Sequence, residues 1–134
     1  MPGRGVGAAS QAVVMAAKDD FGRAGEERAA QHLSACGYEI LERNWRCAQG
    51  EIDIVATRER LLCMIEVKTR RSERFGHPFE AIDERKHQRL WRLAFAWAEA
   101  HPELSTGRRI RLEVIGLTGP DAREARLEHL EDLR

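Results

Sequence analysis

Two neighbouring segments of the chain interrupt hydrophobic runs with charged residues at alternate positions. Residues 50–56 read Gly-Glu-Ile-Asp-Ile-Val-Ala, and residues 61–69 read Leu-Leu-Cys-Met-Ile-Glu-Val-Lys-Thr. Side chains alternate between the two faces of a strand, and runs of β-branched and apolar residues favour strands. The pattern predicts two β-strands that each carry charges on one face. Because charge is costly to bury, these strands are also the first place to look for chemistry.

The faces follow from the two-residue period. In the first strand Glu51 and Asp53 share one face, and the apolar Ile52 and Ile54 share the other. Two acids are therefore expected to point in the same direction.

An antiparallel hairpin centred between positions 59 and 60 would bring the charges of both strands together. Glu66 and Lys68 share a face, and this register sets Asp53 opposite Glu66 and Glu51 opposite Lys68. Residues 58–60 lack the Asn-Gly or Gly chemistry of a tight turn, so we expect a looser loop. A slip of one residue would scatter the charges onto opposite faces.

Apolar periodicity predicts the elements around this hairpin. An aspartate at 19–20 can cap a first helix that ends near Cys36, and Gly37 is suited to a left-handed conformation after it. The stripe through Leu33 turns Glu26 inward. The other predicted elements are a long helix over 81–100, strands over 38–46 and 109–117, and a short strand or helix over 126–133.

Composition indicates one domain. The 134 residues have 43% hydrophobic content and no apolar stretch that approaches a membrane span, so we expect a cytoplasmic protein without membrane association. Residues 1–18, rich in Gly, Ala, Ser and Val, are expected to form a flexible leader before a domain over 19–134. Met1 and Met15 both stay open as the biological start.

Two converging carboxylates with a lysine beside them suit a site for a hard divalent ion. Mg²⁺ prefers oxygen ligands, and such an ion beside a lysine fits phosphodiester hydrolysis. Asp53 and Glu66 are the candidate ligands, and Lys68 is the candidate for orienting water or stabilising charge. The alternative is an ion pair between strands on a solvated face.

The same residues carry a resemblance. Asp53 followed by Glu66-Val67-Lys68 resembles the PD-(D/E)xK signature of the restriction-endonuclease-like superfamily, with Ile52 in place of its proline. Several further motifs, in order, resemble the YraN family of small bacterial proteins from about residue 21 onward. These motifs are Gly25-Glu26-Glu27-Arg28-Ala29-Ala30, Gly37-Tyr38, Arg43-Asn44, Gly50-Glu51-Ile52-Asp53, Glu66-Val67-Lys68-Thr69-Arg70 and Phe75-Gly76.

The resemblance implies an α/β fold with a mixed central sheet flanked by helices. It also implies Mg²⁺ or Mn²⁺ held by Asp53, Glu66 and the carbonyl group of Val67. Glu51 would tune Lys68 or support the ion's surroundings. Glu26 would add an acid from the first helix, as is common in nuclease-like folds; its alternative is a salt bridge to an arginine.

Nucleic acid is the expected partner. The formal net charge is zero, yet residues 68–92 carry eight basic residues against four acidic ones. Arg70 and Arg71 are the best candidates for phosphate contacts, and Lys86 is a third. A basic stripe of the predicted 81–100 helix leaves phosphate binding and a solvated face equally open; its members are Arg85, Arg89 and Arg92. The superfamily includes archaeal junction resolvases, which suggests branched DNA and leaves a homodimer open.

Other reactive residues give weaker signals. The three cysteines lack disulfide or zinc spacing and are expected to be reduced and mostly buried, and the five histidines are expected to be surface or packing residues. Glu113 stands where a YraN-like segment would have aspartate, and its role stays open. Two rival functions remain: a non-catalytic nucleic-acid-binding module with the nuclease fold, and a protein-interaction adaptor with a structural acidic cluster.

Overall fold

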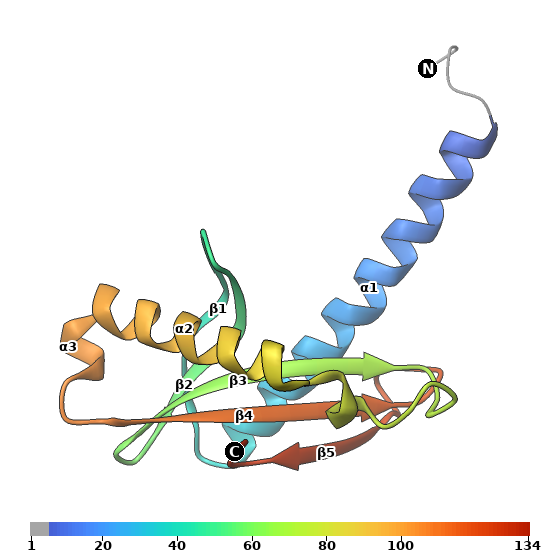
Figure 1. The fold of residues 1–134 in the computed structure, drawn as a ribbon. Coiled ribbons are helices and arrows are strands. Elements are labelled where there is room, and N and C mark those ends of the chain that lie inside the picture. Colours follow the sequence, from blue (N-terminus) through green and yellow to red (C-terminus); the bar gives the residue numbers. More distant parts are fainter. Residues whose placement is uncertain (1–5) are drawn as a thin grey trace.

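The computed structural model describes residues 6–134, with side chains from residue 20 onward. Five strands form one sheet in the order β1-β2-β3-β4-β5 (Figure 1). Strands β3 and β4 are parallel, and the other neighbouring pairs are antiparallel. The strands are β1 (Glu39–Cys47), β2 (Gly50–Arg58), β3 (Leu61–Arg70), β4 (Arg109–Thr118) and β5 (Arg126–Leu130).

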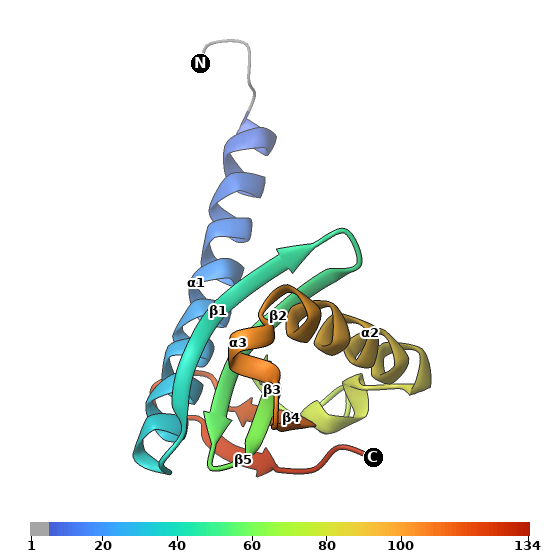
Figure 2. The same ribbon diagram turned by 90° about the vertical axis from the view of Figure 1, so that its left-hand side faces the viewer.

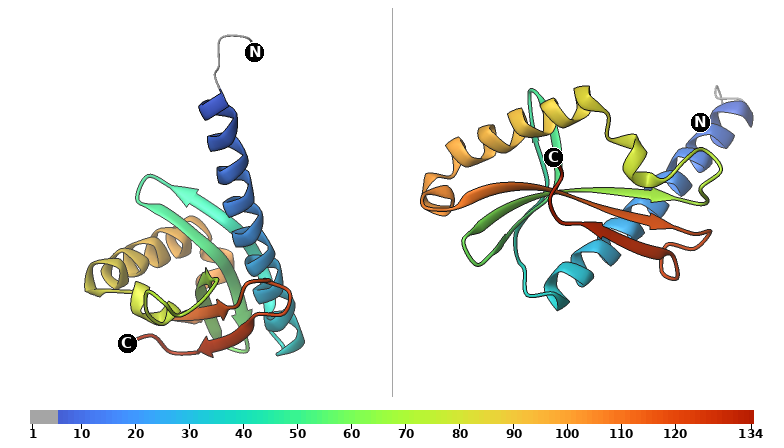
Figure 3. Two further views of the ribbon diagram at one scale, coloured as in Figure 1. Left: turned by 90° about the vertical axis from the view of Figure 1, so that its right-hand side faces the viewer. Right: turned by 60° about the horizontal axis from the view of Figure 1, so that its bottom comes forward.

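Helices cover both faces of this sheet. Helix α1 (Val6–Ala35) lies on one face and α2 (Glu84–Ala100) on the other (Figures 2 and 3). The segment that joins the parallel strands β3 and β4 contains α2, with the short helices η1 (Pro78–Ala81) before it and α3 (Pro102–Ser105) after it. This mixed sheet flanked by helices confirms the predicted α/β fold class, and it is consistent with a restriction-endonuclease-like core.

Each face has its own hydrophobic core. Under α1, Leu33 packs with Ile65 and Ile115, and under α2, Leu93 and Trp97 pack with residues of β2, β3 and β4. Strands buried on both faces explain the continuous apolar runs in β3 and β4. Within the described residues, no helix combines the length and the apolar character that crossing a membrane would require.

The first helix starts much earlier than predicted. It begins at Val6, not at the aspartates of 19–20, so residues 6–18 are helical where a flexible leader was expected; residues 1–5 lie outside the described part. The alanines in this stretch have the highest helix propensity, and no proline follows Pro2 to stop them. The predicted end is confirmed, because the helix ends at Ala35 and Gly37 adopts a φ of 88°.

The predicted hairpin register is confirmed where β2 and β3 pair, from Ile54 opposite Ile65 to Arg58 opposite Leu61. The ladder ends at Ile54, before the predicted partners Asp53 and Glu66. Beyond this point β2 continues beside β1 alone, while β3 continues beside β4. We call this separation of β2 from β3, beyond Ile54 and Ile65, the fork.

Two details of the hairpin were predicted wrongly. Ile52 packs in the core under α2 whereas Ile54 packs in the core under α1, so strict alternation fails at the fork, where β2 no longer follows β3. The turn is also tighter than expected. Glu59 adopts a left-handed φ of 56°, and the carbonyl oxygen of Arg60 accepts a hydrogen bond from the Arg109 backbone, which holds the turn against β4.

The later elements agree more closely with prediction. The long helix begins at Glu84, slightly after the predicted start, because Asp83 caps it by accepting a 2.8 Å hydrogen bond from the Lys86 backbone N–H. Strand β4 covers the predicted 109–117. The segment that was left open as strand or helix is strand β5.

Candidate functional site

Two buried carboxyl groups meet at the fork. Asp53 of β2 and Glu66 of β3 are 9% and 8% exposed. Asp53 Oδ2 accepts a 2.8 Å hydrogen bond from the backbone N–H of Val67. Because β2 and β3 have separated here, the side chain of Asp53 replaces the missing partner of that N–H. The two predicted metal-ligating side chains are therefore brought together.

Two lysines approach Glu66 from different elements. Lys86 Nζ of α2 lies 2.8 Å from Glu66 Oε2, and Lys68 Nζ of β3 lies 4.0 Å from the same oxygen. The cap formed by Asp83 fixes the helix turn that carries Lys86. Lys68 was predicted to lie beside the acids. Lys86 was predicted only as a phosphate contact, and sequence spacing gave no signal of its ion pair with Glu66.

The pKa of Asp53 reflects its surroundings. Burial, with the negative charge of Glu66 as the next cause, raises the pKa of Asp53 to about 8, although the N–H of Val67 works in the opposite direction. Asp53 therefore carries a proton for much of the time at neutral pH. A divalent cation held here would displace that proton.

The pKa of Lys68 is shifted in the opposite direction, below its ordinary value. Burial, followed by the hydrogen-bonding and positive charge of Lys86, lowers the pKa of Lys68, and Glu66 only partly offsets this. A lysine with a lowered pKa exchanges its proton more readily near neutral pH.

Glu26 reaches the same region from α1. A Cβ atom on Gly25 would collide with the side chain of Thr69, so glycine permits this close approach of α1 to β3. Burial raises the pKa of Glu26, whereas a hydrogen bond with Asn44 lowers it, and the charges of Glu51 and Glu66 raise it further. Glu26 thus belongs to the acidic group at the fork. The Gly25 contact and Asn44 were missed as site features, although both lie in the motifs of the family resemblance.

Glu51 occupies a different place from the one predicted. Its Oε2 lies 2.7 Å from Arg46 Nε of β1, and no ion pair between Glu51 and Lys68 occurs among the described residues. Since β2 has left β3 at the fork, the predicted position opposite Lys68 does not arise. Glu51 acts on the site through its charge near Glu26.

The donor set at the fork fits a hard divalent ion. It contains the carboxylates of Asp53 and Glu66, and the backbone of Val67 adjoins both. Oxygen donors of this kind suit Mg²⁺ and Mn²⁺ better than softer metals. The close like charges, which raise the pKa of Asp53, are those that a bound cation would relieve.

A second acidic group fits a metal less well. Glu73, His77 and Glu128 each place one ligand atom within 4.8 Å of the others. His77 Nδ1 accepts a hydrogen bond from the backbone of Phe79, so the proton of a neutral His77 ring lies on Nε2, which faces Glu128 at 2.7 Å. A protonated Nε2 cannot ligate a metal, and Arg126 already pairs with both acids.

Basic residues flank the fork on both sides. Arg70 and Arg71 line a cavity of about 640 Å³ together with Lys68 and Glu26. Arg71 lies 4.1 Å from the ring centroid of Phe21 and donates to a backbone carbonyl group. On the other side, a hollow of about 350 Å³ along α2 is lined by Arg85, Lys86, Arg89 and Arg92.

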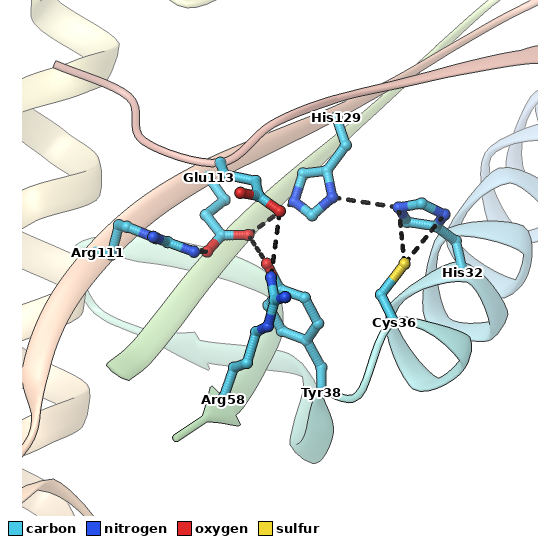
Figure 4. Close-up of polar contacts among 8 residues, drawn as sticks. His32, Cys36, Tyr38, Arg58, Arg111, Glu113 and His129 are labelled. Atoms are coloured by element: carbon cyan, nitrogen blue, oxygen red, sulfur yellow. Dashed lines mark hydrogen bonds and ion pairs between the residues drawn. The ribbon is translucent and has the colours of Figure 1, made fainter. Parts of the chain in front are cut away.

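Sequence reasoning left Glu113 unassigned, and the structure shows a buried network around it (Figure 4). Glu113 Oε1 accepts from Tyr38 Oη at 2.9 Å and lies 2.7 Å from His129 Nε2, while Arg111 donates to Oε2 at 3.0 Å. The other ring nitrogen of His129 lies 3.2 Å from His32. All these partners come from other parts of the sequence except Arg111, so local spacing could not reveal them. The cysteines are free, as predicted, but only Cys63 is buried.

Comparison with known proteins identifies the family. The sequence model of "Uncharacterised protein family UPF0102" matches residues 25–117. A UPF0102 protein of Paenarthrobacter aurescens is 49% identical over 118 residues, which cover 88% of this chain and 96% of the relative. UPF0102 proteins of Arthrobacter sp. and Clavibacter michiganensis are 48% and 46% identical, over 87% and 79% of this chain and 97% and 88% of the relatives. The chain therefore belongs to UPF0102, the YraN family that its motifs resemble.

Proposed function

We propose that this protein is a metal-dependent nuclease that hydrolyses phosphodiester bonds in structured or branched DNA. The observation that carries the proposal is the meeting of two buried acids at the fork, Asp53 and Glu66, beside Lys68 and Lys86. Buried like charges cost stability, and a perturbed carboxyl group in such a place favours a functional explanation. The basic surfaces on both sides of the fork suit a phosphate backbone.

In this proposal Asp53, Glu66 and the carbonyl group of Val67 hold Mg²⁺ or Mn²⁺. When bound, the ion supplies Lewis acidity toward the scissile phosphate. Glu26 adds negative charge that strengthens the attraction for a cation, and Glu51 supports Glu26 in this. Glu51 pairs with Arg46, which agrees with a supporting role for this residue.

The lysines have distinct roles. Lys68, whose pKa is lowered, orients the attacking water and stabilises the negative charge that develops on the phosphate. Without a bound ion, Lys86 neutralises the charge of Glu66. With a divalent ion paired to Glu66 instead, Lys86 would be free to contact a phosphate oxygen of the substrate. Arg70 and Arg71 position the backbone next to Lys68, since phosphate contacts fix the register of the substrate without reading its bases.

Cleavage and metal binding can be tested with one set of variants. Wild type is screened against single-stranded, duplex and branched DNA and RNA with Mg²⁺ or Mn²⁺. Asp53→Asn and Glu66→Gln should lose divalent-ion affinity in calorimetric titrations, because each removes a ligand charge but keeps its shape. Lys68→Ala should keep metal and substrate affinity and cleave about 100-fold more slowly, or slower still. Glu73→Gln, from the second acidic group, is the matched control and should behave as wild type.

The outcomes separate the rival functions. Binding of nucleic acid without any cleavage would favour a non-catalytic binding module with the same fold. Absence of both metal and nucleic-acid binding would favour a protein-interaction adaptor. Wild-type metal affinity in both Asp53→Asn and Glu66→Gln would remove the ion from the fork, and wild-type cleavage by Lys68→Ala would remove that residue from the mechanism.

A further inference from the structure

Phe75 is an exposed aromatic residue close to the proposed nuclease site. Its side chain is 88% exposed, on the loop that follows β3. Exposed aromatic residues gain nothing from the core and are enriched where proteins bind other molecules. The Arg74 guanidinium lies 5.8 Å from the centroid of the Phe75 ring, at the outer limit of a cation–π contact.

Phe75 forms part of the cavity of about 640 Å³ that adjoins the fork. Pockets of about 300–1,000 Å³ are typical for small organic ligands. This one offers aromatic walls and positive charge, and Val67 and Lys68 of the proposed site form part of its lining. Its lining includes Phe21, Glu26, Lys68, Arg70, Arg71 and Phe75.

The cations of this pocket are held in place. The Arg71 guanidinium lies 4.1 Å from the ring centroid of Phe21, and its Nη1 atom donates to the carbonyl oxygen of Pro120 at 3.1 Å. Arginine has five N–H donors, so a fixed Arg71 keeps donors for a phosphate oxygen. Lys68 also lines the pocket, and its Nζ atom lies 4.0 Å from Glu66 Oε2. A ligand here would place a phosphate group near Lys68 and a flat apolar group near Phe75.

An unpaired nucleotide has this combination of groups. Bases in a duplex are already stacked on their neighbours, whereas an unpaired base can stack on an aromatic side chain whatever its identity. The hollow on the other side of the fork differs, because its lining of Ala81, Asp83, Arg85, Lys86, Arg89 and Arg92 contains no aromatic ring. That surface suits a phosphate backbone alone.

We propose that the Phe75 pocket binds an unpaired nucleotide next to the scissile phosphate, so the substrates are duplexes that open into a single strand at the cleavage point. This inference rests on the proposed nuclease function. The α2 arginines contact the duplex backbone, and the Phe75 pocket holds the first unpaired base. A blunt duplex would contact only the arginines of α2 and leave the Phe75 pocket empty.

Binding can be measured without cleavage. Fluorescence anisotropy in Ca²⁺ compares a labelled blunt DNA duplex with the same duplex carrying a short unpaired extension, in the full-length protein. Phe75→Ala should weaken binding to the extended duplex by about tenfold or more, as expected for one lost base–aromatic stack, and should leave the blunt duplex unaffected. Phe75→Trp should retain the preference. Phe95→Ala is the matched control, because Phe95 is also an exposed aromatic residue, 58% exposed on α2.

Each outcome bears on one proposal or the other. Equal wild-type affinity for the two duplexes, or equal losses for Phe75→Ala and Phe95→Ala, would overturn the unpaired-nucleotide site even if the protein cleaves DNA. A preference for the extended duplex that depends on Phe75, without cleavage in Mg²⁺ or Mn²⁺, would support the pocket and overturn the nuclease. Extensions of adenine and of thymine should both lose affinity in Phe75→Ala, because stacking does not depend on the hydrogen bonds of a particular base; a loss confined to one base would overturn a stacking site.

Discussion

Two buried acidic centres lie on the sheet, and they are built in opposite ways. Glu113 is fully buried and receives hydrogen bonds or ion pairs from Tyr38, Arg111 and His129. Asp53 is almost as buried, yet a single backbone N–H and a neighbouring acid surround its carboxyl group. The carboxylate of Glu113 is satisfied by donors within the protein, whereas no cationic side chain pairs with Asp53 among the described residues.

Their pKa values express this difference. Burial alone would raise the pKa of Glu113, but hydrogen bonds from His129, Cys63, Tyr38 and Arg111 outweigh it, and the pKa lies below its ordinary value. At Asp53 burial and a second acid act together, and the pKa rises to about 8. Burial of a carboxyl group therefore does not by itself single out a candidate site, whereas burial without compensating donors favours one.

The largest expected effect is at the satisfied centre. Glu113→Gln should destabilise the folded protein by about 3–5 kcal/mol, because Arg111 would be left as an unpaired charge of low exposure. Urea unfolding at pH 7 measures this, and folded Glu113→Gln should keep the divalent-ion affinity of wild type. Glu131→Gln, which removes an exposed partner of Arg58, is the control. A loss no larger than that of the control would show that the network is not structural.

Neutralising the buried acid at the fork should increase the stability of the protein, in contrast to the loss expected at Glu113. The folded pKa of Asp53 is raised, so its contribution to stability is complete below the ordinary value near 3.8 and is lost as pH rises toward about 8. Without metal at pH 8, Asp53→Asn should therefore be more stable than wild type by about 1 kcal/mol or more, and this gain should vanish near pH 4. Urea unfolding in EDTA at both pH values tests this, with exposed Asp132→Asn as the control. An increase in stability of Asp53→Asn that is the same at both pH values would contradict a raised pKa of Asp53.

The smallest effect comes from removing one donor of the satisfied centre. Tyr38→Phe deletes the 2.9 Å hydrogen bond to Glu113 and should cost about 1 kcal/mol, because His129 and Arg111 remain. The lowered pKa of Glu113 makes its stabilisation present above the ordinary value near 4.5 and lost at lower pH. Tyr38→Phe should therefore lose less stability than wild type on acidification between pH 5 and 3. An unchanged acid dependence would show that Tyr38 does not tune Glu113.

The sequence predicted the features that depend on residues close together in the chain, such as strand register and the end of a helix. The register of β2 and β3 follows from a two-residue period and one turn, and the end of α1 follows from Gly37. The fork was not predictable in this way, because it depends on β1 holding β2 and on β4 holding β3. The early start of α1 was missed because Gly7, Ser10 and Gln11 interrupt the apolar pattern of residues 6–18 and hide their helical propensity.

Glu66 and Glu113 show the limit most clearly. Each is an acid inside a buried apolar strand, with hydrophobic residues on both sides, so the two give the same signal in the sequence. The residues that contact each acid decide whether its charge is satisfied. His129 reaches Glu113 from β5 and Tyr38 reaches it from the residue before β1, while Glu66 faces Asp53 across the fork. Before the structure was known, Glu66 was favoured by its expected place opposite Asp53, by Lys68 two residues later and by the family resemblance.

The parallel pairing of β3 with β4 has a consequence for the order in which the molecule folds. The β2–β3 hairpin joins residues close in sequence, so it can close early, and it already contains Asp53, Glu66 and Lys68. Lys86 arrives only when the crossover through α2 docks and β4 takes its place beside β3. An early hairpin would hold its acids without that counter-charge. The repulsion between Asp53 and Glu66 is therefore offset at Glu66 only after α2 has docked.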